Sequence, residues 1–402
     1  MADNRLDISE LPQERLERFK ALYTQARKTS EVWRQDAKDD YGFVEGTTHW
    51  TTEQQEEMRR QKRPALVMNN ILPIINLISG QERVSRLGLT FKPRGLDDDR
   101  FSQIANSTYR YAADISDLIY EVSSAFQDEC ICGRGYLYFN MDYSDPAEPL
   151  GEITAKRINP LSVFFDPNYT KYNMQDATYI IIAKWVHEDM VRKIYPNQMA
   201  DVRVGEWLEL PAESVGEKTL DADWKNFRTG QIRIMEFWYK VPNTVTFMIS
   251  AEGEIRRMKS NENAKKIRDE IALLYRSAGM MVPDIQIAER TIWDARIAHL
   301  TGWKILLDKP SPFKSNLYPI APFTAYTFDE KVMGVVRSLK DPQREKNKRW
   351  SQMLHMINTM AKGGWKIPKR SVSERQLSIW SEEAGKPGFW FEYNTIVGKP
   401  EE

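Results

Sequence analysis

The sequence has few of the side chains that carry most metal and redox chemistry. Its 402 residues include two cysteines and four histidines, and the histidines are scattered at His49, His187, His299 and His355. A zinc site needs three or four converging nitrogen or sulfur donors, and none of these histidines has a neighbour at ligand spacing. Cys130 and Cys132 stand one residue apart, so a disulfide between them would be strained. We therefore predict two packed free thiols, a reducing compartment and no bound metal or other cofactor.

Common catalytic motifs are also missing. No G-x-x-x-x-G-K-[ST] loop occurs, which excludes a self-contained P-loop motor, and no G-x-S-x-G nucleophile elbow occurs either. Gly133-Arg134-Gly135 follows a predicted helix and precedes a predicted strand, the reverse of the order in phosphate cradles, so it predicts a turn. His187-Glu188 resembles the start of a metalloprotease helix but lacks the second histidine, and it predicts a helix start instead. Adjacent acids such as Asp39-Asp40 project differently and form no dyad, so the sequence indicates a protein that is not an enzyme.

Neither sign of charge is in excess. Lys plus Arg and Asp plus Glu both number 57, so the formal net charge is zero. Proteins that bind DNA tightly by neutralising phosphates are usually strongly basic, so any contact with nucleic acid here should be local and transient. Long apolar runs are missing too: Leu72–Ile78 and Tyr179–Val186 are too short to cross a bilayer, and the N-terminus has no apolar signal-peptide core. We expect a soluble chain that is made inside the cell.

What the sequence does contain is globular core material in an α+β pattern. Hydrophobic residues make up 41% of the chain and aromatic residues 11%, enough for two or three domains. Helical spacing of apolar residues predicts helices in residues 1–60 and at about 69–86, 100–130, 187–195, 260–278 and 341–360. Alternation and β-branched or aromatic residues predict strands at 89–92, 135–143, 152–158, 162–165, 179–186, 232–241 and 245–250, with further short strands at about 285–306. The chain therefore predicts an α+β fold in which two late helices flank a small β insert.

Capping signals give several helix starts. Thr51 or Thr52 precedes acids suited to a first turn, and Asn69 or Asn70 precedes a helix that carries Pro73 near its start. Asp341 followed by Pro342 predicts the start of the last helix, since proline is favoured at the first helical position. Gly279 is expected just after the helix at 260–278.

Two features of the late helices stand out from the rest of the sequence. The 341–360 helix carries the basic residues Arg344, Lys346, Lys348 and Arg349, and an apolar stripe of Trp350, Met353, Leu354, Ile357 and Met360. The 260–278 helix carries Lys265, Lys266, Arg268 and Arg276. A solvated basic face is the plain interpretation of either helix. Beside a channel, however, such a face would contact a phosphate backbone without reading its sequence. Our candidates for a DNA channel or a subunit interface are Arg344, Lys346, Lys348, Arg349, Trp350, Lys265, Lys266 and Arg268.

Several segments together resemble the portal proteins of tailed phages, especially those of the short-tailed podovirus type. The segments are Asn69–Arg94, Ala125–Tyr143 (AFQDECICGRGYLYFNMDY), Glu152–Tyr169 (EITAKRINPLSVFFDPNY), Met174–Pro196 and Tyr318–Ser351, which contains YPIAPF and GVVRSLKDPQREKNKRWS. No one of these segments is specific alone, but their order over about residues 60–360 makes the resemblance persuasive.

The resemblance implies a portal fold with a mixed α/β wing, a two-helix stem and a small β-containing clip. The expected domains are an N-terminal helical arm at 1–60, a wing at 61–256, a stem helix at 257–278, a clip at 279–330, a second stem helix at 331–362, and a return to the wing or channel-loop region at 363–402. Portals of this type commonly continue with further helices, whereas this sequence stops at Gly398-Lys-Pro-Glu-Glu. Either the subunit is shortened or the sequence is part of a longer chain.

The implied function is a ring of twelve subunits at one capsid vertex, through which double-stranded DNA is packaged and ejected. The implied partners are other copies of the chain, DNA held transiently, the large terminase subunit, neck or adaptor and tail proteins, coat protein and scaffolding protein, without a membrane. The subunit would be assembled in the bacterial cytoplasm and end in the virion. Two alternatives remain open at this point: another head-neck structural protein such as an adaptor, or a metal-dependent nuclease or hydrolase formed by acids that are distant in sequence.

Overall fold

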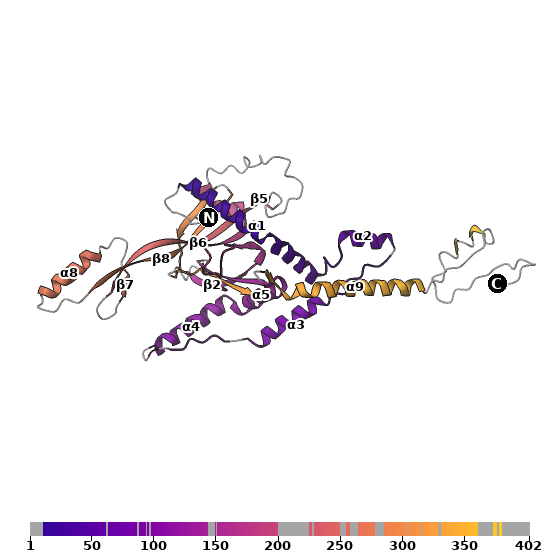
Figure 1. Ribbon diagram of the computed structural model, residues 1–402, viewed down its shortest axis with the longest axis horizontal. Coiled ribbons are helices and arrows are strands. Elements are labelled where there is room, and N and C mark those ends of the chain that lie inside the picture. The colour runs from indigo at the N-terminus through magenta and orange to yellow at the C-terminus, as the bar shows by residue number, and fades with distance from the viewer. Residues whose placement is uncertain are drawn as a thin grey trace, which may run out of the picture. The chain divides into compact units, whose positions relative to one another are not determined.

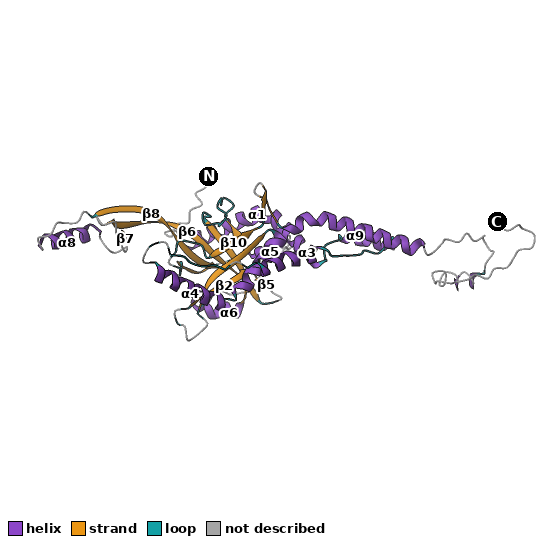
Figure 2. Ribbon diagram, turned by 90° about the horizontal axis from the view of Figure 1, so that it is seen from below, coloured by secondary structure: helices purple, strands orange, loops and turns teal. Residues whose placement is uncertain are grey.

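The structure is a computed structural model with an α+β fold (Figures 1 and 2). It describes residues 11–61, 63–86, 88–93, 95, 98–143, 149, 151–199, 225–226, 229–249, 255–257, 264–277, 285–302, 304–313, 315–328, 331–360, 373–375 and 378–379. The chain divides into two compact units. Unit 1 comprises residues 1–38 and 79–334, and unit 2 comprises residues 39–78 and 335–402. The predicted α+β class is confirmed.

Unit 1 is built around two antiparallel sheets. One sheet has the order β10-β1-β2, and the other has the order β3-β4-β6-β8-β9, with β5 and β7 also paired to β6. Their bounds are β1 Arg134–Asp142, β2 Glu152–Ile158, β3 Val163–Phe165, β4 Tyr179–His187, β5 Lys225–Asn226, β6 Gln231–Ile249, β7 Ile255–Arg257, β8 Gln286–Leu300, β9 Ile305–Pro310 and β10 Ile320–Thr324. A small hairpin joins β11 Tyr326–Phe328 to β12 Lys331–Met333. The strands predicted between 135 and 186 are confirmed, each within two residues at its ends.

The larger sheet buries a different apolar cluster on each face. On one face, Phe19 and Tyr23 of helix α1 (Pro12–Glu45) pack with Phe237 and Tyr239, and the rings of Phe19 and Phe237 lie 4.8 Å apart. On the other face, Trp238 packs against side chains of β1 and β10, including Tyr136 and Ile320. Because successive residues of a strand point to opposite faces, Phe237 and Trp238 serve the two clusters in turn. The sheet is therefore covered on both sides, which explains why β6 has an almost continuous apolar run rather than a strict alternation.

Two helices accompany the smaller sheet, α4 (Asp99–Ile115) and α5 (Leu118–Cys132). The sequence predicted one helix over 100–130, but the structure breaks it at Asp117, which has a left-handed φ of +46°. This break turns the chain so that α5 can pack along β1 and β2. Asp128 of α5 binds Arg157 of β2 with a 2.7 Å hydrogen bond to Oδ1. Gly133 ends α5 with a φ of +88°, so the Gly-Arg-Gly segment is the turn that the sequence predicted.

A long hairpin of β6 and β8 extends beyond the sheet and carries helix α8 (Ala264–Ser277) (Figure 1). The sequence predicted two strands at 232–241 and 245–250, but β6 runs unbroken through Pro242 from residue 231 to 249. At the far end of this hairpin, Ile267 and Ile271 of α8 pack against Met248. The predicted helix at 260–278 is thus present, and the expected cap Gly279 lies outside the described residues.

Residues 279–330 were expected to form a small insert between two stem helices. Their strands β8 and β9 instead belong to the larger sheet and β10 to the smaller one, with partners as early as β1. The physical reason is the length of β8, whose 15 residues pair with β6 from Met235 to Ile249. The names wing, stem and clip remain predictions at this stage, and most of the expected 363–402 region lies outside the described residues.

Unit 2 is centred on helix α9 (Val335–Met360) and contains helix α2 (Thr52–Arg60). Helices α1 and α3 (Ile71–Val84) each contribute residues to both units. The predicted caps are confirmed: Thr51 forms a capping box with Gln54, and Asn69 Oδ1 accepts from the backbone N–H groups of Ile71 and Leu72. Residues 89–92, predicted as a strand, have no regular secondary structure.

The start of α9 differs from the prediction. The helix begins at Val335, so Pro342 lies inside it rather than at its first position. A proline inside a helix costs roughly 3 kcal/mol because it removes one hydrogen bond and crowds the preceding turn. Contacts before the proline offset this cost: Arg337 and Lys340 bind the fully buried carboxylate of Asp40 at 2.8 and 2.7 Å. Tertiary contacts thus override the local capping signal.

The remaining helices are short. They are α6 (Glu188–Ile194), which begins after His187 as predicted, α7 (Pro196–Met199) and a single 3-10 turn at Pro160–Ser162. Within the part of the chain that the structure describes, every helix is too short or too polar to cross a membrane.

Candidate functional site

Helix α9 has three distinct faces, and one of them buries polar side chains. The buried face holds Lys340, Gln343, Asn347 and Ser351, all at most 8% exposed. An ordinary amphipathic helix buries its apolar stripe instead. Another segment of the chain must therefore cover the polar face of α9.

An extended segment, residues 63–70, lies along the polar face, and we call it the strap. Alternate strap residues donate backbone N–H groups to α9 side chains. The pairs are Leu66 with Ser351 Oγ at 3.1 Å, Met68 with Asn347 Oδ1 at 3.0 Å and Asn70 with Gln343 Oε1 at 3.2 Å. Gln343 also donates its amide to the Met68 carbonyl at 2.5 Å. The strap therefore runs antiparallel to α9 and is held by side chains in place of a neighbouring strand.

The spacing of Gln343, Asn347 and Ser351 along α9 matches the spacing of alternate residues along the strap. Four residues of an α-helix rise about 6 Å, whereas two residues of an extended chain span about 6.6 Å. Polar side chains four apart on α9 can therefore meet every second residue of the strap over this length. The N–H groups of Leu66, Met68 and Asn70 each gain an acceptor in this way, where a neighbouring strand would otherwise supply one.

His49 extends the same network. Its Nδ1 lies 2.8 Å from Asn347 Nδ2, and its Nε2 lies 2.8 Å from the Phe43 carbonyl. Because Asn347 Oδ1 already accepts from Met68, the Asn347 amide nitrogen must donate to Nδ1. Nε2 then carries the proton and donates to the carbonyl. These two contacts fix the ring orientation of this histidine, which is 2% exposed.

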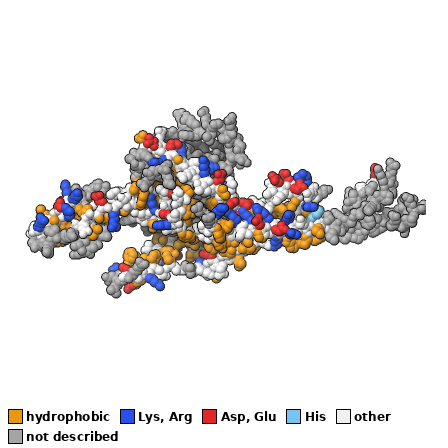
Figure 3. Space-filling view, viewed as in Figure 1, with side chains coloured by type: hydrophobic (Ala, Val, Ile, Leu, Met, Phe, Trp, Pro, Cys, Tyr) orange, Lys and Arg blue, Asp and Glu red, His pale blue; other side chains and the backbone are white. Residues whose placement is uncertain are grey.

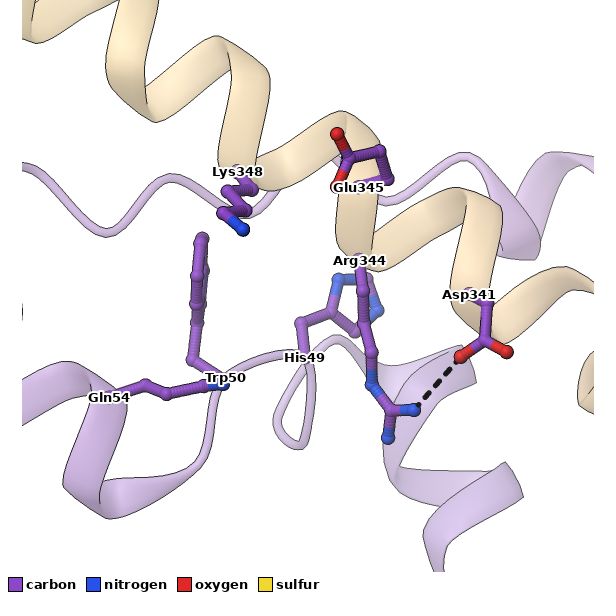
Figure 4. A pocket seen from close by; sticks show the side chains of 7 residues that line it. All are labelled: His49, Trp50, Gln54, Asp341, Arg344, Glu345 and Lys348. Atoms are coloured by element: carbon purple, nitrogen blue, oxygen red, sulfur yellow. Dashed lines mark hydrogen bonds and ion pairs between the residues drawn. The ribbon is translucent and has the colours of Figure 1, made fainter.

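The second face of α9 borders a pocket of about 240 Å³ (Figure 4). Its lining residues are His49, Trp50 and Gln54 from the N-terminal part of unit 2, and Asp341, Arg344, Glu345 and Lys348 from α9. Arg344 pairs with Asp341 at 3.3 Å, and Glu345 pairs with Arg349 at 2.6 Å. The Arg349 hydrogen bond lowers the pKa of Glu345. The pocket therefore combines one aromatic wall with charges of both signs.

The third face of α9 is apolar and exposed. Trp350, Met353 and Ile357 have 40%, 43% and 57% of their surfaces accessible. Figure 3 shows hydrophobic side chains along the side of α9 away from α2, whereas charged side chains gather over α2. The stripe predicted from the sequence is thus present, and among the described residues Trp350, Met353 and Ile357 are exposed while Leu354 is half-buried. The stripe member Met360 has a side chain outside the described ones.

The sequence-predicted basic residues fall into two groups. Arg344, Lys348 and Arg349 are exposed on α9 and Lys346 is half-buried there, with Arg344 and Lys348 at the pocket. Lys265, Lys266 and Arg268 are exposed on α8 in unit 1, where Arg268 pairs with Asp269 at 3.1 Å. The fold therefore brings Arg344 and Lys348 to one pocket, whereas Lys346 and Arg349 are not among its lining residues and the α8 group lies in the other unit.

Sequence reasoning missed the polar face of α9. Gln343, Asn347 and Ser351 are neutral, so they did not stand out beside the charged and aromatic residues. The available signal was their four-residue repeat of hydrogen-bonding side chains, which marks one helix face. His49 was dismissed as isolated because its partner Asn347 is 298 residues away in sequence.

With this geometry in view, the chain can be compared with known proteins. The family model for phage P22-like portal proteins matches residues 20–401. The chain belongs to the P22-like phage portal protein family. No curated protein gives a match. Membership makes the chain a structural protein of the phage head-to-tail connector, with a role in DNA packaging and a place in the virion capsid.

Membership in the portal family agrees with the chemistry of the site. In the described residues, no group of three or more His, Cys, Asp or Glu side chains could hold a metal ion. The conspicuous feature of unit 2 is instead a helix with two faces open to other molecules.

Proposed function

We propose that this portal subunit closes into a ring of twelve copies at one capsid vertex, and that α9 is a stem helix of that ring. The observation that carries the proposal is the exposed apolar face of α9. A helix fixed to its own subunit by a polar ladder has its apolar stripe free to pack against a neighbour. Head-to-tail association of this kind uses different surfaces on the two partners and closes when the rotation between them divides a full turn.

The ring would be a conduit for double-stranded DNA. A channel must let the duplex slide, and many strong phosphate contacts would hold it instead. The zero net charge of the chain and the presence of Asp341 and Glu345 among the bases of α9 support weak, averaged contact. We propose that some of Arg344, Lys348 and Arg349 face the channel or line the contact between subunits, where the ring would repeat each of them in every copy.

The same ring would be the docking platform for other virion proteins. We propose the large terminase subunit during packaging, neck or adaptor and tail proteins afterwards, and coat and scaffolding proteins during capsid assembly in the bacterial cytoplasm. The long β6/β8 hairpin with α8 at its end offers Lys265, Lys266 and Arg268 as an exposed basic surface for such a contact or for DNA.

Electron microscopy of the purified protein tests the proposal. We expect annular particles with a central hole wide enough for a DNA duplex, and a particle mass many times 47.0 kDa by light scattering. Monomers that cleave DNA in the presence of a divalent metal would contradict it. A ring in which Arg344, Lys348 and Arg349 all lie on the outer surface would contradict the assignment of these residues while leaving the ring intact.

A further inference from the structure

The exposed aromatic side chain of α9 and the pocket beside α9 lie on opposite sides of the same helix. Lys348 lines the pocket, and Trp350 is two residues further along. Two residues of an α-helix turn the chain by about 200°, so these side chains point in nearly opposite directions. A single copy cannot therefore place its own Trp350 in its own pocket.

The pocket and the surface around Trp350 are complementary in chemistry. The pocket offers the indole of Trp50 and the cations of Arg344 and Lys348, and cations attract the face of a second indole. At its rim stands Asp341, whose side chain is 93% exposed. One turn before Trp350 on α9 stands Lys346, the opposite charge. An aromatic side chain with a neighbouring cation thus matches an aromatic, cationic pocket with an acid at its edge.

The size of the pocket also fits a side chain better than a free ligand. Sites for small molecules usually enclose about 300–1,000 Å³, and they are mostly apolar. The pocket, at about 240 Å³, is smaller and carries four charged side chains. Trp350 is 40% exposed, so its indole can leave the α9 surface without unpacking a core.

We infer that Trp350 of one copy enters the pocket formed by Trp50, Gln54, Arg344 and Lys348 of the next copy. The inference rests on the proposed ring and adds the pair of surfaces that joins its subunits. Because the donor side chain and the acceptor pocket lie on opposite sides of α9, each copy gives one contact and receives one. This is the arrangement that a head-to-tail ring needs. Lys346 of the donor then lies toward Asp341 of the acceptor.

Disulfide cross-linking tests the pairing directly. In the variant Q54C/W350C, oxidation is expected to link each copy to the next and give a ladder of covalent oligomers on a non-reducing gel. The native Cys130 and Cys132 are buried, so they should not add bands. The matched control is Q54C/S107C, in which the second cysteine is exposed on α4. It is expected to show no ladder.

A second variant tests how much the packing of the Trp350 side chain contributes to ring assembly. W350A should raise the concentration needed for half-maximal ring assembly by about thirtyfold, as for a central aromatic contact at an interface. The control M190A removes another exposed apolar side chain, 55% accessible on α6, and should leave assembly unchanged. Both variants should keep the unfolding temperature of the unsubstituted protein, which separates an assembly defect from misfolding.

The outcomes separate this inference from the proposed function. Rings of the unsubstituted protein together with a ladder from Q54C/W350C support both. Rings without a ladder, or equal loss of assembly in W350A and M190A, would overturn the pairing and leave the ring standing. Absence of rings from the unsubstituted protein would overturn the proposed function, and the pairing with it.

Discussion

The two units of this portal subunit differ in the side chains that they bury and expose. Unit 1 buries large apolar side chains on both faces of its main sheet, with Phe237 and Trp238 at most 1% exposed. Unit 2 buries a row of polar side chains on α9 and leaves Trp350 and Met353 in solvent. The first interior is stabilised by removal of apolar surface from water, whereas the second adds hydrogen bonds and ion pairs to a smaller apolar interior that includes Phe43, Ile71 and Ile75. The difference is the basis of our proposal that the exposed apolar side chains of α9 pack against another copy.

The largest effect is expected from the apolar interior of unit 1. F237A removes a ring that packs against Phe19 of α1, and it should lower the free energy of unfolding by about 3–5 kcal/mol. Urea unfolding followed by tryptophan fluorescence measures the change. F101A, at an α4 side chain that is 74% exposed, is the matched control and should cost less than about 0.5 kcal/mol. Similar losses in both variants would show that burial does not determine the stability of this unit.

A smaller effect is expected from the polar interior of unit 2. N347A deprives the Met68 N–H group and His49 Nδ1 of their partners, and each buried group left without one costs about 1–3 kcal/mol. Hydrogen–deuterium exchange of the strap should therefore speed up markedly. N358A, at an exposed position on the same helix, should leave the strap protected. Unchanged exchange in N347A would mean that the side-chain ladder does not hold the strap.

The smallest effect concerns pH and is confined to unit 1. Burial lowers the pKa of His299, whose Nδ1 shares a 2.5 Å hydrogen bond with Tyr195. In the unfolded chain His299 takes up a proton near pH 6.5, whereas in the folded chain the buried His299 stays uncharged. The free energy of unfolding should therefore fall as pH drops below about 6.5. Burial alone would raise the pKa of the nearby Glu236, but Lys184 lowers it overall. The contribution of the ionised Glu236 to the free energy of unfolding is therefore lost only in more acidic solution.

Urea unfolding at pH 7.5 and 5.5 measures this dependence. In H299Q the stability of unit 1 should change less between the two pH values than in the unsubstituted protein. An identical slope in both proteins would remove His299 as the cause. Hydrogen–deuterium exchange of the strap, residues 63–70, followed in parallel reports on unit 2 separately from unit 1.

Local signals gave much of the secondary structure but failed where distant contacts compete with them. The Thr51 and Asn69 caps were predicted from side chains that act on backbone groups two or three residues away. Asp341-Pro342 is an equally good local signal, yet α9 starts six residues earlier because Asp40 binds Arg337 and Lys340. Likewise β6 continues through Pro242, because β8 pairs with β6 from Met235 to Ile249.

The candidate site shows the same limit. The basic residues and apolar stripe of α9 were visible in the sequence, and so was the order of segments that indicated a portal protein. The strap was not visible, because an extended segment held by side chains has no periodicity of its own. The partnership of His49 with Asn347 joins residues 298 positions apart, which no pattern within one helix can reveal.

The sequence by itself determined the α+β class, the portal family and the residue types on α9, since composition, periodicity and segment order are properties of the chain. Only the tertiary structure decided which face of α9 is covered. The periodicity of a helix marks its faces, but whether a face is buried depends on what the rest of the chain places against it. Here the backbone of the strap covers the polar face, and Trp350 and Met353 of the apolar face are exposed.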